Sequence, residues 1–112
     1  ERRSNGYHDV ASYGSESRAH KDYQVARKSA PYGYCWEEMA GWDYRLQADE
    51  YDLRFFQVTQ ASGHWLRVFY LARYGRYVTV LNLWVVAEDM QPEEMEHVIQ
   101  ALDETFAQVK ED

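Results

Sequence analysis

Two long apolar runs joined by a short connection constrain the fold of this chain more than any other feature. The runs are HWLRVFYLAR, residues 64–73, and YVTVLNLWVVA, residues 77–87, and only residues 74–76 separate them. Both are rich in β-branched and aromatic residues, which is typical of strands. Because a parallel return needs a crossover of about a dozen residues, the short connection predicts an antiparallel hairpin.

The residues before this hairpin extend the β pattern. Apolar residues alternate over residues 51–55, and the turn sequence QASG, residues 60–63, leads into the hairpin. Aromatic residues also alternate over residues 32–36 and 42–46, with EEMAG, residues 37–41, predicted as the turn between them. We therefore predict a meander of three strong strands with a fourth before them.

An amphipathic helix is predicted at the end of the chain. Pro92 suits the first helical position, and Glu93 and Glu94 suit the positive end of the helix dipole. The apolar stripe consists of Met95, Val98, Ile99, Leu102, Phe106 and Val109. The side predicted to face water carries Glu96, Gln100, Asp103, Glu104 and Gln108. The stripe must lie on the sheet, because nothing else in a chain of 112 residues could bury it.

The first part of the chain gives a weaker pattern. Residues 1–15 are polar, with scattered Gly and Ser, and they predict a flexible N-terminal arm. Helical spacing of Ala and Tyr predicts a short helix over residues 16–29 that ends before Pro31. The predicted class is α+β: an antiparallel β-meander of four to five strands with a C-terminal amphipathic helix packed on one face and a short N-terminal helix or arm. Residues 16–112 are predicted to form a single domain.

The hairpin also predicts which residues share a face of the sheet. With residues 74–75 as the turn, Leu71 would oppose Val78 and Trp65 would oppose Trp84. One face is then the floor for the C-terminal helix. The second face carries Arg54, Phe56, Trp65, Arg67, Phe69, Val78, Val80, Asn82 and Trp84. An exposed face of an antiparallel sheet is usually polar, so this apolar face requires a cover: the N-terminal segment, a second copy of the protein, or a ligand or partner.

The candidate binding residues lie on that second face. Arginine offers a planar fork for carboxylates or phosphates, and tryptophan walls exclude water around it. We predict a ligand- or partner-binding site made of Arg54, Phe56, Trp65, Arg67, Asn82 and Trp84. A purely structural alternative has Arg67 stacked on a tryptophan and paired with Asp52.

Constellations for catalysis or metal binding are weak. Cys35 is the only cysteine, and a lone cysteine in an aromatic strand is most often a small buried hydrophobe. Adjacent Glu37 and Glu38 fit a solvated turn better than general acid–base catalysis. The four histidines, far apart in the sequence, are His8, His20, His64 and His97. We predict no catalytic residue, no metal site and no cofactor, with an enzyme using Cys35 or the glutamates as the last alternative.

Charge and hydropathy limit the partners. The net charge of -7 disfavours nonspecific binding to nucleic acid, which depends on neutralising phosphates. No apolar run approaches the roughly 18 residues that span a bilayer. We expect a soluble protein, cytoplasmic in preference to exported, without nucleic-acid or membrane partners. The sequence begins at Glu1 and not at Met, so the sequence does not decide whether a targeting segment was removed.

The order of segments in the C-terminal half resembles the RelE/HigB-like toxins. YDLRFF, WLRVFYLARYG and YVTVLNLWV come before QPEEMEHVIQAL. The resemblance implies cleavage of messenger RNA at the ribosome, which in those toxins relies on basic residues after the last strand. Residues 85–89 read VVAED here, so the chain would be a degenerate relative without the nuclease residues. The run YVTVLNLWVVA followed by LDETFAQV is also similar to the PsbP-like fold, which implies a noncatalytic binding or assembly role.

The patterns together predict a noncatalytic small protein that acts through protein–protein interaction. Self-association as a homodimer through the aromatic sheet face is the first expectation. The alternative is a binding module for a small anionic or aromatic ligand on the face that carries Arg54, Trp65, Arg67 and Trp84.

Overall fold

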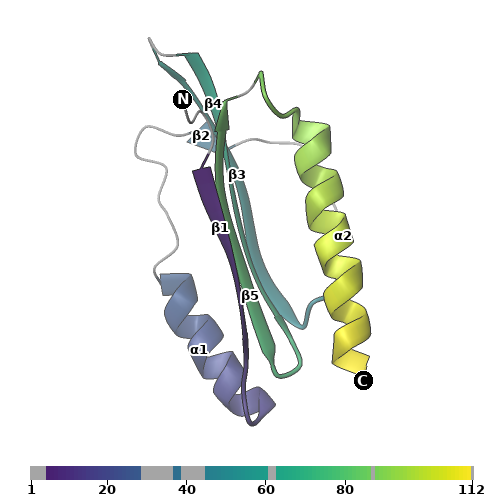
Figure 1. The fold of residues 1–112 in the computed structure, drawn as a ribbon. Helices are drawn as coiled ribbons and strands as arrows, with labels where there is room; N and C mark the ends of the chain where they lie inside the picture. Colours follow the sequence, from purple (N-terminus) through teal and green to yellow (C-terminus); the bar gives the residue numbers. More distant parts are fainter. Residues whose placement is uncertain (1–4, 29–36, 39–44, 61–62, 87, 112) are drawn as a thin grey trace.

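The computed structural model describes residues 5–28, 37–38, 45–60, 63–86 and 88–111. In this part of the chain, one antiparallel sheet of five strands stands between two helices (Figure 1). The helix near the N-terminus and the helix at the C-terminus lie on opposite faces of the sheet. The predicted α+β class, with an antiparallel sheet and a C-terminal helix packed on one face, is confirmed.

Seven elements follow one another along the chain. They are β1 (Asn5–Ser12), α1 (Glu16–Lys28), β2 (Glu37–Glu38), β3 (Glu50–Gln60), β4 (Gly63–Tyr74), β5 (Tyr77–Val86) and α2 (Pro92–Glu111). The strand order across the sheet is β1-β5-β4-β3-β2, and every neighbouring pair is antiparallel. The three long strands β3, β4 and β5 form the predicted meander, and β1 and β2 add the two edges.

The turn between β4 and β5 lies one residue later than predicted. Tyr74 opposes Tyr77, so Gly75 and Arg76 are the two turn residues. Gly75 has a φ of 61°. Among the described residues only glycines have a positive φ, so the φ of Arg76 is negative. This matches a type II′ turn, which takes glycine first and suits the twist of a hairpin.

The later turn changes the partners across the hairpin but not the faces. Trp84 opposes Arg67 instead of Trp65, and Leu71 opposes Val80 instead of Val78. The predicted pairs were therefore wrong by two residues. Because side chains alternate with a period of two, a shift of two residues leaves each one on its predicted face.

The register between β3 and β4 keeps Arg54 and Phe56 on the second face, as predicted. Gln60 opposes Gly63 at the end of this hairpin, and residues 61–62 between them lie outside the described residues. Phe55 opposes Val68 on the face below α2, and Arg54 opposes Phe69 on the other face.

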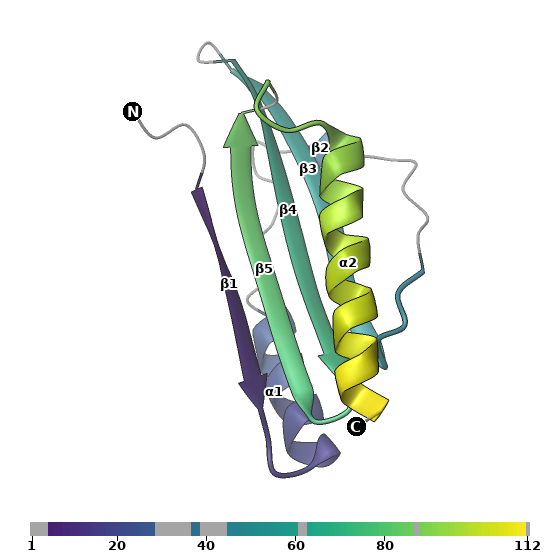
Figure 2. The same ribbon diagram turned by 45° about the vertical axis from the view of Figure 1, so that its right-hand side comes forward.

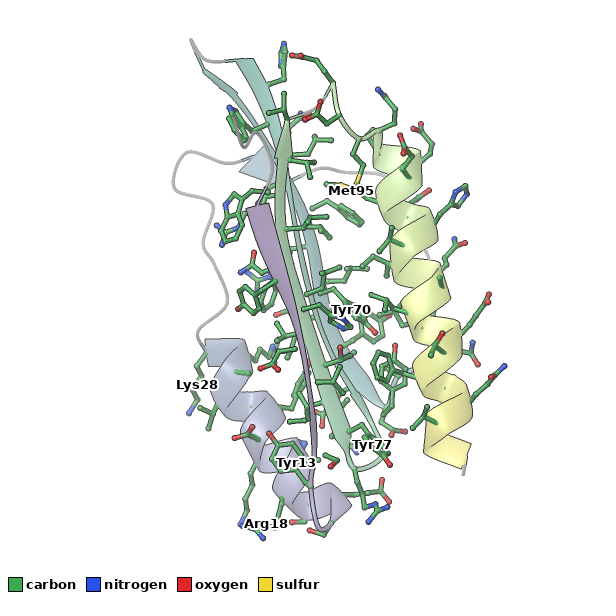
Figure 3. The ribbon with its side chains drawn as sticks, in the orientation of Figure 1. Tyr13, Arg18, Lys28, Tyr70, Tyr77 and Met95 are labelled. Carbon is green, nitrogen blue, oxygen red and sulfur yellow. The ribbon has the colours of Figure 1, made fainter. Side chains whose placement is uncertain are left out.

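The main core lies between the sheet and α2. The helix begins at Pro92 as predicted, and the Gln91 backbone N–H donates to Glu94 Oε1 at 3.1 Å, as in a capping box. Met95 and Ile99 are buried, and Figure 3 shows Met95 and Tyr70 between α2 and the sheet. The core consists of Leu46, Phe55, Leu66, Val68, Tyr70, Ala72, Tyr74, Leu81, Val85, Met95 and Ile99.

Two residues of α2 depart from the predicted pattern. Val98, placed in the apolar stripe, is exposed, and Asp103, placed on the side facing water, is 0% exposed. The Asp103 carboxylate accepts hydrogen bonds from the Tyr74 hydroxyl (2.6 Å) and from the Gln47 backbone N–H (2.9 and 3.1 Å). These donors replace the water that a buried carboxylate loses, and helical spacing alone does not reveal them.

A smaller core on the second face is made with α1. Ser15 caps the helix, since its Oγ accepts from the Arg18 backbone N–H at 3.2 Å. Ala19 and Tyr23 are buried against one end of the sheet face. Their partners are Phe69, Leu71 and Val78, with Val80 packed beside them. The helix α1 thus covers part of the second, apolar face of the sheet, which was predicted to be covered.

The strand β1 forms inside the segment predicted as an arm. It pairs with β5 along its whole length, from Asn5 opposite Trp84 to Ser12 opposite Tyr77. A Cβ atom at Gly6 would lie 2.7 Å from the Asn82 backbone oxygen, so glycine allows this close approach. The division into an arm and a single domain stays a prediction.

The opposite edge of the sheet is short. In β2, Glu37 opposes Gln57 and Glu38 opposes Phe56, so these glutamates belong to a strand and not to the predicted turn. Of the predicted strands around them, residues 32–36 and 42–44 lie outside the described residues. Leu46 is in no strand but is buried in the main core.

Candidate functional site

The second face of the sheet has two unlike ends. One end lies beneath α1 and carries the small core around Leu71. The other end is here called the Arg67 patch and consists of Tyr7, Trp65, Arg67, Asn82 and Trp84. Register places these residues side by side on three strands: Tyr7 opposes Asn82 across β1 and β5, and Trp84 opposes Arg67 across β5 and β4.

Arg67 is the centre of the patch. Its guanidinium carbon lies 4.3 Å from the ring centroid of Trp84, and its Nε donates to Asn82 Oδ1 at 3.3 Å. Such a stacked cation is worth about 0.5–2 kcal/mol, more as water is removed. Partial burial lowers the pKa of the Arg67 guanidinium, and the nearby Tyr7 phenol opposes this shift. Asn82 and Trp84 thus hold the fork in one orientation.

Among the described residues, no carboxylate pairs with Arg67. Both terminal nitrogens of its guanidinium lack a hydrogen-bond acceptor there. Asp52, the partner that sequence reasoning offered, instead accepts from Arg54 Nε at 2.9 Å and Arg54 Nη2 at 3.0 Å, with Arg27 at 3.5 Å. A half-buried cation without a counter-ion is costly, so this arrangement is suited to an anion from outside the described residues.

The other predicted site residues are divided between the two ends. Phe56 opposes Arg67, so the two side chains share a face of the sheet, and Phe56 is buried, with 4% of its surface exposed. Trp65 is partly exposed next to Arg67 on β4. Arg54 opposes Phe69, and its ion pair with Asp52 assigns it to the end beneath α1. The Arg67 patch therefore contains four of the six predicted residues, Phe56 lies next to it across β3 and β4, and Arg54 lies apart.

Tyr7 is the member of the patch that sequence reasoning missed. Its side chain is 53% exposed, on a strand whose described side chains are all exposed. A strand exposed on both faces has no alternation of apolar and polar residues, so no periodic signal marks it. Only its pairing with β5 brings it to Asn82.

The end beneath α1 contains a dense ionic network. Arg73 Nε donates to Glu50 Oε2 at 2.5 Å, and Arg73 Nη1 lies 3.6 Å from Asp49 and 3.5 Å from Glu16. His20 Nδ1 also lies 2.6 Å from Glu50 Oε2. Burial alone would raise the pKa of Glu50, but the bonds from His20 and Arg73 prevail and lower it. Every charge here has a partner within the chain, so this network fastens α1 to the sheet.

A second polar cluster lies inside the main core. The Tyr70 and Tyr74 hydroxyl oxygens are 2.7 Å apart, and Tyr74 donates to Asp103. Burial raises the pKa of both phenols. All three side chains are 0% exposed, so a substrate has no access to them. The cluster is consistent with a structural role and not with a catalytic one.

Other chemistry is sparse in the part of the chain that the structure describes. It holds no group of three or more His, Cys, Asp or Glu side chains arranged for a metal ion. Cys35 lies outside the described residues, and so does its predicted strand. Neither α1 nor α2 combines the length and apolar character needed to cross a membrane.

Comparisons with known proteins add no relative. A scan of protein-family models, a search of curated proteins and a search of solved structures each returned no match.

Proposed function

We propose that the protein acts by binding and not by catalysis, and that the Arg67 patch receives a carboxylate group. The observation that carries this proposal is the guanidinium of Arg67, stacked on Trp84 and held by Asn82, with no carboxylate partner among the described residues. A guanidinium fork binds a carboxylate through two parallel hydrogen bonds.

Charge favours a single carboxylate over a phosphate or a nucleic acid. Arg67 is one cation, because the charge of Arg54 is already taken up by Asp52. The chain as a whole has a net charge of -7, which repels a dianion or a polyanion more strongly than a monoanion. The indole of Trp84 and the phenol of Tyr7 favour an apolar or aromatic group beside the carboxylate.

Titration with benzoate, followed by tryptophan fluorescence, tests the proposal. We expect a saturable response with a dissociation constant on the order of 1 mM, which corresponds to about 4 kcal/mol. Benzyl alcohol, the neutral counterpart, should give a response at least about tenfold weaker, since loss of a charged hydrogen bond costs about 1.5–3 kcal/mol. Inorganic phosphate should compete poorly.

Two variants make the test specific to this site. Arg67→Gln should abolish the benzoate response, whereas Arg76→Gln should keep it, because Arg76 is exposed in the β4–β5 turn. An equal response in wild type and Arg67→Gln, or an equal response to benzoate and benzyl alcohol, would contradict the proposal.

A further inference from the structure

Charge is distributed unevenly between the two helices. The sequence of α2 contains six acidic residues and one lysine, whereas that of α1 contains two acidic and four basic residues. Figure 2 shows the two helices on opposite sides of the sheet, so the sheet separates the basic helix from the acidic one. A chain with a net charge of -7 therefore has a locally basic element.

Two cations of α1, Arg18 and Lys21, have no ionic partner among the described residues. By contrast, Arg27 Nε lies 3.5 Å from Asp52 Oδ2, so the charge of Arg27 is already paired. Arg18 and Lys21 are both exposed, and their spacing of three residues places them as neighbours on one side of the helix. This side of α1 therefore presents two cations that the described part of the chain does not pair.

A hollow of about 280 Å³ lies beside these cations and is here called the α1 hollow. Its lining consists of Tyr13, Arg18, Lys21, Asp22 and Val25. Figure 3 shows Tyr13 lying against α1 and Arg18 extending from the first turn of the helix. Pockets for drug-sized molecules have volumes of about 300–1,000 Å³, so the α1 hollow suits a smaller molecule with a single ring.

Tyr13 and Val25 supply the apolar part of the α1 hollow. Val25 is 62% exposed, and covering an aliphatic side chain of this size is favourable. The Tyr13 hydroxyl donates to Asp22 Oδ2, and burial together with this bond raises the pKa of the Tyr13 phenol to about 12. The phenol is therefore neutral at pH 7 and adds no negative charge. A ring bound in the hollow would cover apolar surface of both Tyr13 and Val25.

We propose that the α1 hollow binds a small phosphate monoester that carries an apolar ring. Two cations without partners match the charge of about −1.5 to −2 that a phosphate monoester has at pH 7, whereas Arg67 alone matches one carboxylate. Salt at about 0.15 M screens charges beyond roughly 8 Å, so these adjacent cations outweigh the net charge of -7. The carboxylate of Asp22 opposes the ligand and keeps its affinity modest. This second site shares no residue with the Arg67 patch and does not depend on the proposed function.

Titration of the full chain with phenyl phosphate, followed by the NMR chemical shifts of backbone amides, tests the proposal. At about pH 7.5, where the phosphate is a dianion, we expect saturable shifts centred on residues 13 and 18–25. The dissociation constant should be on the order of 1 mM. Benzyl alcohol, which lacks the charge, should bind at least about tenfold more weakly. Benzoate should instead shift amides around Arg67, so the two sites are observed separately.

Three variants assign the binding to the α1 hollow. The double variant Arg18→Gln, Lys21→Gln should bind phenyl phosphate at least about tenfold more weakly, because it removes both charged donors. Lys28→Gln is the matched control, because Lys28 is exposed on the same helix but does not line the hollow, and its affinity should equal that of wild type. Asp22→Asn removes the opposing charge and keeps an acceptor for Tyr13, so it should tighten binding about two- to fivefold.

The outcomes separate this proposal from the proposed function. Arg67→Gln should lose benzoate binding and keep phenyl phosphate binding, whereas loss of both would locate the phosphate at the Arg67 patch and overturn the α1 site. The proposal is also overturned if wild type shows no binding at about 20 mM phenyl phosphate. Equal affinities of wild type and the double variant, an equal loss in Lys28→Gln, or weaker binding in Asp22→Asn would each overturn it as well. Circular dichroism should show the same fold for all variants, since the replaced side chains are exposed.

Discussion

Arg67 and Arg73 lie on the same strand and the same face of the sheet, yet their surroundings are opposite. Arg73 is surrounded by Glu50, Asp49 and Glu16, and these contacts join β4 to α1. Arg67 has an amide and an indole, and none of the described carboxylates pairs with it. Among the described residues, the ionic contacts at the end beneath α1 are therefore complete, whereas Arg67 at the other end has the arrangement on which our proposal of carboxylate binding is based.

The largest expected effect of a substitution comes from the end beneath α1. Leu71→Ala should lower the free energy of unfolding by about 2–5 kcal/mol, because it leaves a cavity between α1 and the sheet. Urea denaturation followed by circular dichroism measures this effect. Val25→Ala, at an exposed position of the same helix, should change stability by less than about 0.5 kcal/mol. A loss below about 1 kcal/mol for Leu71→Ala would mean that α1 does not cover this end.

Replacing each arginine by leucine gives the sharpest test of the comparison. Arg73→Leu should cost about 1–3 kcal/mol, since partly buried Glu50 loses its arginine partner and keeps only His20 and Gln24. Arg67→Leu should be neutral or stabilising, because it removes a half-buried charge that has no counter-ion within the described residues. The measurement is urea denaturation of both variants. If Arg67→Leu proved as destabilising as Arg73→Leu, Arg67 would be a structural residue and not a binding residue.

A smaller effect should appear as pH dependence at Glu50. Its folded-state pKa is below the ordinary value of 4.5, so the ionised carboxylate stabilises the fold above that pH and loses this contribution as the pH falls through the folded pKa. Wild type should exceed Glu50→Gln in stability by about 1 kcal/mol at pH 7. The gap should begin to close as the pH falls below 4.5 and should shrink further as it passes through the lower pKa of the folded state, which thermal denaturation at several pH values would show. A gap independent of pH would assign the effect to packing.

The sequence predicted the elements whose patterns are local and periodic. The runs in β4, β5 and α2 are long enough for their periodicity and turn residues to identify them. The predicted register of β4 and β5 was wrong by two residues, but each side chain still lies on its predicted face of the sheet. β1 escaped prediction because its side chains are exposed on both faces. Asp103 was misplaced because its burial depends on Tyr74 and Gln47, which are distant in sequence.

The candidate site was predicted in part for the same reasons. The alternation of side chains along the strands predicted that Arg67, Asn82 and Trp84 share a face of the sheet, and the structure places them next to one another there. The ionic partner of each arginine could not be predicted from the sequence. Asp52 pairs with Arg54 and not with Arg67, and only the side-chain geometry shows this. Tyr7 lies next to Asn82 only because β1 pairs with β5, which is far from it in the sequence.

That pairing also sets an order of events during synthesis. His8 meets Thr79 across 71 residues of chain, so β1 has no partner until β5 has left the ribosome. The meander of β3, β4 and β5 involves near neighbours in sequence and is able to assemble first. Until β1 arrives, the edge of β5 is open to other strands. Of the described strands, β1 is the first to be synthesised but cannot pair until β5 is complete, and its pairing then covers the edge of β5.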